Sequence, residues 1–205
     1  MIFVEVNKTM NQLRQLFLHH NGIVKTNDVI ECGIHHSYIK KAIENGMVEK
    51  IKQGVYQWVE TSQQDDWDVI HYLYSDGVIC SLSALHHYRY IDRTPSELHL
   101  AFVRTINRKR FKNNSVRIAA HFVSAELLLI GVTNEEFGNQ RMQIYSRERL
   151  ICDVIRQMHQ LDREIVNQSI KSYLADPNKN IAMLKPFAKT FRVEKKVDHL
   201  IGMWL

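Results

Sequence analysis

Apolar residues near the amino end of the chain recur at helical spacing and predict a first helix over residues 9–20. Thr9 stands three positions before Gln12, which is the spacing of a capping box at a helix start. Asn21 and Gly22 follow, and both residue types favour the left-handed conformation that ends many helices. The apolar face of this predicted helix consists of Met10, Leu13, Leu16 and Phe17.

Two shorter helices are predicted next, over residues 26–32 and 36–45. Thr26 is the expected N-cap of the earlier one, because its hydroxyl can accept a hydrogen bond from an amide of the first turn. Gly33 and Gly46 follow the two patterns directly, and glycine at that position ends a helix without steric cost.

The predicted helix over residues 36–45 has an apolar face and a polar face. The apolar stripe, which we expect to be buried, consists of Ile39, Ala42 and Ile43. Positions three and four apart lie on one side of a helix. The opposite, polar stripe therefore consists of Ser37, Lys40, Lys41 and Glu44.

Two short apolar runs within residues 47–58 flank Lys52, Gln53 and Gly54. This pattern predicts a β-hairpin with a tight turn. A hairpin that follows three short helices is the element order of a winged helix-turn-helix. We therefore expect a winged helix-turn-helix domain over residues 1–60.

The polar stretch at residues 60–66 predicts a linker, after which the pattern changes. A larger mixed α/β domain that ends in helices is expected over residues 66–205, with Pro186 interrupting or ending one of those helices. The fold class is thus α+β. In the first half of this domain we predict helices at residues 66–74 and 81–88 and strands at 78–80, 97–103, 116–123 and 140–145.

The composition is that of an ordinary soluble globular protein, with 45% hydrophobic and 24% charged residues. The net charge of +5 permits nucleic-acid binding without requiring it. No apolar run is long enough for a transmembrane helix and no signal peptide is visible, so we expect a cytoplasmic protein with no membrane partner. The isolated Cys32, Cys80 and Cys152 predict neither a disulfide framework nor a zinc site.

The polar face of the third predicted helix is the first candidate surface for nucleic acid. A recognition helix presents such a face to the major groove, while the hairpin contacts phosphates or the minor groove. The alternative is a solvated face used for protein contacts, because acids nearly balance the lysines and arginines of residues 1–60. The candidate DNA-binding residues of this domain are Thr26, His35, His36, Ser37, Tyr38, Lys40, Lys41, Lys50, Lys52 and Gln53.

A second candidate surface is the basic segment between the predicted strands at 97–103 and 116–123. Residues 104–118 contain no Asp or Glu, so this segment would bind a polyanion in a salt-dependent way. The alternative is a solvated hairpin loop. The cations that we assign to this surface are Arg104, Arg108, Lys109, Arg110 and Lys112.

The eleven histidines raise the question of a metal site. Adjacent pairs such as His35 and His36 point about 100° apart on a helix, so one pair seldom chelates one ion. The sequence also lacks the His-Glu-x-x-His pattern, the glycine-rich phosphate loops and the nucleophile motifs of common enzymes. We therefore predict no metal, no cofactor and no catalytic residue.

Residues 20–58, HNGIVKTNDVIECGIHHSYIKKAIENGMVEKIKQGVYQW, resemble the winged-helix domain of AbiEi-type antitoxins of bacterial abortive-infection (type IV toxin–antitoxin) systems. Further along, SLSALHHYRYIDRTPSELHLAF and IYSRERLICDVIRQ are similar to later parts of that family. The second of these carries a Ser-x-Glu-Arg-x-x-x-Asp pattern. In this chain the pattern corresponds to Ser146, Glu148, Arg149 and Asp153.

The resemblance implies a transcriptional autorepressor that binds inverted repeats in its own promoter, as a possible homodimer. It also implies an antitoxin that neutralises a co-encoded nucleotidyltransferase-like toxin without forming a stable complex. Two alternatives stay open from the residues themselves. One is a protein-interaction module, and the other is an enzyme acting on nucleic acid with the basic segment as its clamp.

Overall fold

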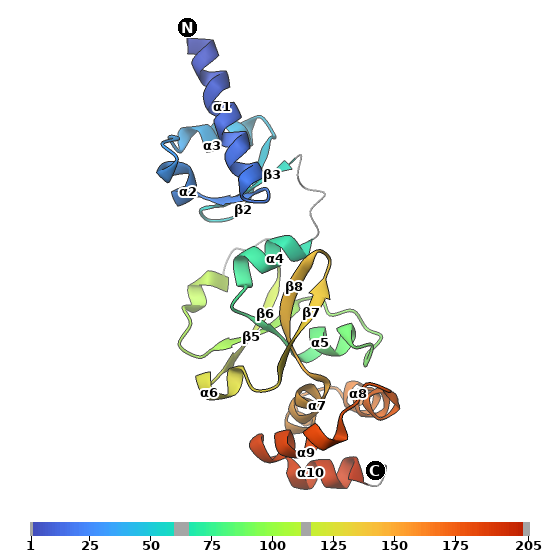
Figure 1. Cartoon of the computed structure of the whole chain (residues 1–205). Helices are drawn as coiled ribbons and strands as arrows, with labels where there is room; N and C mark the ends of the chain where they lie inside the picture. Colours follow the sequence, from blue (N-terminus) through green and yellow to red (C-terminus); the bar gives the residue numbers. More distant parts are fainter. Residues whose placement is uncertain (1, 60–65, 112–115, 203–205) are drawn as a thin grey trace. The chain divides into compact units, whose positions relative to one another are not determined.

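The computed structural model describes residues 2–59, 66–111 and 116–202, which form two compact units (Figure 1). The N-terminal unit comprises Met1–Tyr74 with the short segments Phe111–Ser115 and Gly138–Gln140. The C-terminal unit comprises Ser75–Arg110, Val116–Phe137 and Arg141–Leu205. Of the predicted linker, residues 60–65 lie outside the described residues, and residue 66 begins a helix.

The N-terminal unit combines short helices with a three-stranded antiparallel sheet of order β1-β3-β2. The predicted succession of helices and hairpin is found, with the hairpin turn at Gln53 and Gly54. The elements are α1 (Ile2–His19), β1 (Ile23–Lys25), α2 (Thr26–Glu31), α3 (Ser37–Glu44), β2 (Val48–Lys52), β3 (Val55–Trp58) and α4 (Asp66–Tyr74).

Two features of this unit differ from the prediction. Helix α1 begins at Ile2 rather than at residue 9, so Thr9 lies inside the helix and does not cap it. No glycine or proline precedes Thr9, so nothing in the sequence stops the helix from extending toward the amino end. Strand β1 was not predicted, because three residues are too few to show an alternating pattern.

One apolar core holds the helices against the sheet of the N-terminal unit. The rings of Phe17 and Trp58 pack with centroids 5.4 Å apart, joining α1 to β3. The predicted apolar face of the first helix is confirmed, since Leu13 and Phe17 are fully buried and Met10 and Leu16 pack against them. The remaining buried members of this core are Val24, Val29, Ile34, Ile39, Ala42 and Val48.

The C-terminal unit is built on a five-stranded sheet of order β6-β5-β4-β8-β7. The predicted strands are found, whereas β7 and the short helix α6 were missed. Strand β4 pairs antiparallel with β5 and parallel with β8. The elements of this part are β4 (Val78–Ile79), α5 (Ser81–His87), β5 (Leu98–Val103), β6 (Ile118–Val123), α6 (Ala125–Leu128), β7 (Val132–Phe137) and β8 (Gln140–Tyr145).

Strands β5 and β6 pair in parallel, from Leu98 opposite Ile118 to Val103 opposite Val123. The basic segment between them is therefore not a hairpin loop, which corrects that alternative. A parallel pair needs a connection that returns to the starting edge of the sheet. The 3-10 helix η2 (Arg108–Phe111) forms part of this connection.

Helices close the C-terminal unit, and α7 packs against α8, α9, α10 and α5 (Figure 1). Ser146 and Asp162 are the N-caps of α7 and α8, and the side chain of each accepts a backbone hydrogen bond. Pro186 lies inside α9 and does not end it. Leu184 and Ala188 on either side of it are buried, and this packing offsets the cost of proline in a helix. The helices are α7 (Arg147–Arg156), α8 (Arg163–Ala175), α9 (Ile181–Thr190) and α10 (Glu194–Leu200).

The remaining sequence expectations concern membranes and cysteines. Near the carboxyl end, Val197 and Ile201 are buried, while Trp204 lies outside the described residues. In the described ranges no helix is both long enough and apolar enough to cross a membrane. Cys32 is exposed, Cys80 and Cys152 are buried, and all three carry free thiols.

A histidine pair links β5 to β6. His99 Nδ1 and His121 Nε2 lie 2.9 Å apart, so one nitrogen donates to the other and the pair cannot hold two protonated rings. Burial lowers the pKa of both rings from 6.5. His121 lowers the pKa of His99 further, whereas Glu97 opposes this shift at His99 and Asp153 opposes it at His121.

Because the folded-state pKa values are lowered, the unfolded chain binds more protons below about pH 6.5. The stability contributed by this pair is therefore present above that pH and is lost as the pH falls. We expect His121→Gln to reduce the drop in urea midpoint between pH 7.5 and 5.5, measured by circular dichroism. The exposed His159→Gln is the control, and equal drops in both variants would contradict this assignment.

Candidate nucleic-acid interface

The start of α2 is tied to the tip of the hairpin. The backbone N–H of Thr26 donates to the carbonyl oxygen of Gly54 over 3.0 Å, and the Thr26 hydroxyl lies 3.5 Å from the same oxygen. Helix α2 begins at Thr26, so Thr26 is the first helical residue and not the predicted N-cap. Lys25 is the N-cap, and its backbone N–H donates to Asp28 Oδ2 over 2.8 Å. Thr26 thus holds the hairpin against α2.

The start of α3 depends on two predicted contact residues. His35 Nδ1 accepts a hydrogen bond from the backbone N–H of Ser37 over 3.3 Å and lies 2.9 Å from the Ser37 hydroxyl. His36 occupies the N-cap without a side-chain hydrogen bond of its own. The rings of His35 and His36 are 4.4 Å apart, and both side chains are exposed. His35 and Ser37 therefore organise the helix start.

The outer face of α3 carries two exposed lysines. Lys40 Nζ lies 3.9 Å from Glu44 Oε1, and the Lys40 side chain is 81% exposed, so this ion pair contributes little to stability. Lys41 Nζ lies 5.4 Å from the centre of the Tyr38 ring, in cation–π range. Both ammonium groups face water and can reach an anion without breaking a strong contact.

Ile43 is not buried, which corrects the predicted apolar stripe of α3. Its side chain is 38% exposed, whereas Ile39 and Ala42 are buried. Ile43 lies at the edge of the stripe, where it lines a hollow of about 370 Å³ formed by α2, α3 and the hairpin. The predicted contact residues that share this hollow are Thr26, His36, Lys40, Lys50 and Gln53.

The hairpin contributes the remaining cations. Lys50 Nζ donates to Gln53 Oε1 over 2.8 Å, which positions both side chains at the turn. Lys52 is half-buried. The lining of the hollow does not include His35, which precedes α3, or the α3 residues Ser37, Tyr38 and Lys41, or Lys52 of the hairpin.

Two arginines of the basic segment, Arg108 and Arg110, contact other side chains of the C-terminal unit. Both Nη atoms of Arg110 donate to the carboxylate of Asp76, over 2.7 and 2.8 Å. The Arg108 guanidinium lies 4.3 Å from the centre of the Phe122 ring. Arg104, Arg108 and Lys109 are exposed, and Lys112 lies outside the described residues. The exposed cations of this segment are therefore fewer than the sequence suggests.

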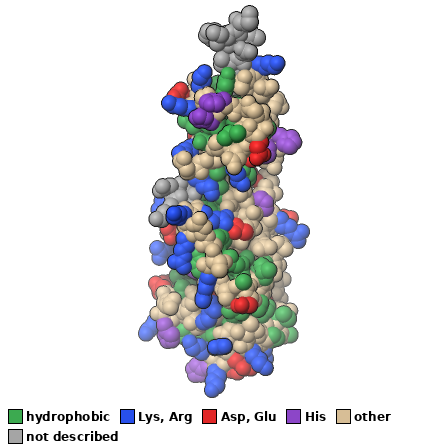
Figure 2. All heavy atoms as spheres, turned by 90° about the vertical axis from the view of Figure 1, so that its left-hand side faces the viewer, with side chains coloured by type: hydrophobic (Ala, Val, Ile, Leu, Met, Phe, Trp, Pro, Cys, Tyr) green, Lys and Arg blue, Asp and Glu red, His purple; other side chains and the backbone are tan. Residues whose placement is uncertain are grey.

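Lys and Arg side chains are scattered over the face of the molecule drawn in Figure 2, among hydrophobic and acidic ones. This distribution differs from the continuous basic stripe that marks strongly basic nucleic-acid-binding domains. Any contact to phosphates through this face therefore depends on individual cations.

The Glu-Arg-x-x-x-Asp motif of α7 encloses a buried cation. Arg149 is 0% exposed, and its Nε donates to Asp153 Oδ2 over 2.8 Å. Its Nη1 donates to the carbonyl oxygens of Leu127 and Ile130, each over 3.0 Å. The guanidinium lies between the rings of Tyr145 and Phe191, 4.3 and 3.7 Å from their centres.

Gly131 makes room for this arginine. Its backbone has φ +73°, and a Cβ at this position would lie 2.7 Å from Arg149 Cβ. The motif residues Arg149 and Asp153 thus connect α6, β8, α7 and α9. The Arg149 side chain is fully buried and that of Asp153 is 12% exposed, so their contacts hold the elements of this unit together.

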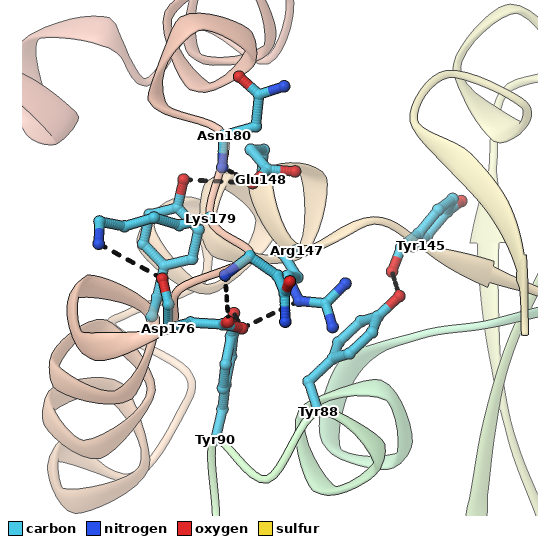
Figure 3. Close-up of polar contacts among 10 residues, drawn as sticks. Tyr88, Tyr90, Tyr145, Arg147, Glu148, Asp176, Lys179 and Asn180 are labelled. Carbon is cyan, nitrogen blue, oxygen red and sulfur yellow. Dashed lines mark hydrogen bonds and ion pairs between the residues drawn. The ribbon is translucent and has the colours of Figure 1, made fainter.

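A second polar cluster, drawn in Figure 3, joins β8, α7 and the end of α8. Tyr90 Oη and Arg147 Nε both donate to Asp176 Oδ2, over 2.7 and 2.9 Å. Burial alone would raise the pKa of Asp176, but hydrogen bonds from Tyr90, the Asn178 amide and Arg147 lower it below its usual value. The Arg147 guanidinium lies 4.3 Å from the centre of the Tyr88 ring.

This cluster borders an open hollow of about 570 Å³. Sequence reasoning missed it, because its members are separated by up to 88 positions between Tyr88 and Asp176. Arg89, at φ 59° two residues after the end of α5, lines the same hollow. In the described ranges no group of three or more His, Cys, Asp or Glu side chains is placed to hold a metal ion.

Residues 11–58 match a protein-family model described as the transcriptional regulator AbiEi antitoxin. The matched stretch runs from α1 to the end of β3, and the resemblance predicted from the sequence is confirmed over these residues. No curated protein matches the chain.

The buried ion pair of α7 provides a test of the role assigned to its motif. Asp153→Ala leaves the buried Arg149 charge without its counter-ion, which costs about 3–5 kcal/mol. The matched control is Arg156→Ala, because Arg156 Nη2 also donates to Asp153, over 2.7 Å, but its side chain is 37% exposed. We expect the control to cost at most about 1 kcal/mol. Hydrogen exchange of the α7 amides measures both, and equal protection in the two variants would contradict the assignment.

Proposed function

We propose that this chain, whose residues 11–58 match the AbiEi antitoxin regulators, is a DNA-binding transcriptional autorepressor and antitoxin. The observation that carries the proposal is the agreement of the family match with a surface suited to DNA. Within the matched residues, α3 and the hairpin bring Lys40, Lys50 and Gln53 around one hollow.

We interpret the N-terminal unit as a winged helix-turn-helix in which α3 is the recognition helix. Helix α3 has eight residues, so at 1.5 Å per residue it is about 12 Å long, close to the width of the major groove. Its exposed face carries Lys40 and Lys41, and the hairpin carries Lys50 beside it. With α3 in the groove, the hairpin cations lie where the DNA backbone passes.

The operator that suits this unit is an inverted repeat bound by two copies of the chain. A single copy has little net positive charge to attract DNA, because acids nearly balance Lys and Arg in residues 1–60. Each phosphate contact contributes a limited and salt-sensitive share of affinity. Two symmetry-related copies double the contact set, and the palindrome of the site follows the two-fold axis of the dimer.

The lysines around the hollow test DNA binding directly. In the double variant Lys40→Ala, Lys50→Ala, two phosphate contacts are lost, so the slope of log affinity against log salt falls by about two. The measurement is a fluorescence-anisotropy titration of the full chain with the duplex upstream of its own gene, at several salt concentrations.

The matched control for this experiment is Lys171→Ala, Lys189→Ala, which removes two exposed lysines from α8 and α9. We expect the wild-type affinity and salt slope for the control. Equal slopes in both double variants, or no preference of the wild-type chain for the upstream duplex over random DNA, would refute the assignment.

The second part of the proposal is that the chain acts in the cytoplasm as an antitoxin against a co-encoded partner. We infer that the chain neutralises a nucleotidyltransferase-like toxin without a lasting complex, and that the C-terminal unit is responsible. This inference follows from the family resemblance. The protein-interaction module remains the competing function, favoured by the open hollow beside Arg147 and Asp176.

Co-expression separates the two functions. We expect the chain to restore growth of cells that express the adjacent nucleotidyltransferase-like gene, while affinity purification recovers no stoichiometric partner. The Lys40→Ala, Lys50→Ala variant, expressed from an unrelated promoter, restores growth equally, because neutralisation does not need the DNA-binding face. Recovery of a stoichiometric complex would favour the interaction module, and absence of growth rescue would refute the antitoxin role.

A further inference from the structure

Two isoleucines are exposed in the hollow between α2, α3 and the hairpin. Ile30 of α2 is 56% exposed and Ile43 of α3 is 38% exposed, and both line the same hollow of about 370 Å³. Apolar side chains that share a concave, water-exposed site gain free energy when a ligand covers them. The hollow therefore offers an apolar contact that the unit itself leaves unfilled.

Charged and polar groups surround these isoleucines. Lys40 stands three residues before Ile43 on the same side of α3, and its ammonium group forms an exposed ion pair with Glu44. Across the hollow, Lys50 and Gln53 come from the hairpin. A ligand that fits this arrangement is a polyanion with a small apolar group set among polar edges.

The major groove of DNA has this chemistry. Phosphates border the groove, and the base edges inside it present hydrogen-bonding groups together with the 5-methyl group of thymine. A methyl group of this kind is the apolar feature that sets thymine apart from the other bases in the groove. Apolar side chains on a recognition helix contact that methyl group in sequence-specific complexes.

We propose that Ile43 and Ile30 form a recognition site for the thymine 5-methyl group, so that the operator carries thymine opposite α3. The proposal rests on the DNA-binding function proposed above and adds a base preference to it. Lys40 and Lys50 contact phosphates of the DNA backbone, and the isoleucines select thymine over cytosine at the position between them. A protein partner on this hollow is the competing occupant, which the charged rim makes less suitable.

The length of α3 allows this contact. Ile43 is the seventh of eight residues, and the whole helix extends about 12 Å, so its last turn stays within the width of the major groove. Because Ile30 is 56% and Ile43 is 38% exposed to water, replacing them by alanine removes less buried apolar area than a substitution in the core does. Variants at these positions therefore report on binding.

The experiment replaces thymine by deoxyuridine, which removes only the 5-methyl group. The probe is the tightest-binding duplex selected from a randomised pool with the full chain, prepared with thymine or with deoxyuridine. Each methyl group buried contributes about fourfold in affinity, so we expect the wild-type chain to bind the deoxyuridine duplex at least about fourfold more weakly.

The same pair of duplexes is titrated with Ile43→Ala, Ile30→Ala, where the difference between thymine and deoxyuridine disappears. Leu18→Ala is the control, because Leu18 is 46% exposed on α1 and does not line the hollow, and it keeps the wild-type difference. Substitution by deoxyuridine also alters the shape of the duplex, and this effect is common to all variants and cancels in the comparison.

The outcomes separate the two proposals. Tight binding with equal affinity for both duplexes overturns the methyl-recognition site and leaves DNA binding intact. A thymine preference that persists in Ile43→Ala, Ile30→Ala also overturns it, because other residues would then read the methyl group. If the wild-type chain binds no duplex from the pool, both the DNA-binding function and this site are refuted.

Discussion

The pairing of β1 with β3 determines how the N-terminal unit presents its surface. Three residues, Ile23 to Lys25, pair antiparallel with Val55 to Gln57, and the ladder ends where Thr26 N–H donates to Gly54 O. Because α2 begins at Thr26, this pairing fixes the distance between α2 and the hairpin tip. The core around Phe17 and Trp58 then fixes α1 against β3. The hollow between α2, α3 and the hairpin results from both constraints.

Sequence periodicity predicted which segments form helices and strands more reliably than it predicted which strands pair with one another. Helix α4 and strand β8 have the predicted bounds, because their apolar patterns are long enough to distinguish the two periods. Strand β1 was missed because its conformation comes from pairing with β3, thirty residues later. The parallel pairing of β5 and β6 was also beyond prediction, since topology leaves no mark on the period of a strand.

The candidate site was predictable in its chemistry and not in its shape. Position on a helical wheel places Ile43 beside Ile39 and Ala42, yet only the last two are buried, because Ile43 borders the hollow between α2, α3 and the hairpin. Arg147 and Arg149 show the same limit in the other unit. They are two positions apart on α7, but one borders an open hollow and the other is fully enclosed. Their different surroundings come from α6, α8 and α9, which the local sequence does not specify.

If the unit binds DNA as proposed, its small net charge and the exposed isoleucines of its hollow have complementary effects on recognition. Cations raise affinity for any DNA, so a unit with few of them binds random sequence weakly and loses little protein to it. Discrimination must then come from contacts to base edges, each of which contributes about 1–3 kcal/mol. An isoleucine at the end of α3 can contribute to that discrimination without adding charge. For a repressor of the proposed kind, the ratio of specific to random binding decides occupancy of the operator, and that ratio increases when contacts to base edges replace some of the phosphate contacts.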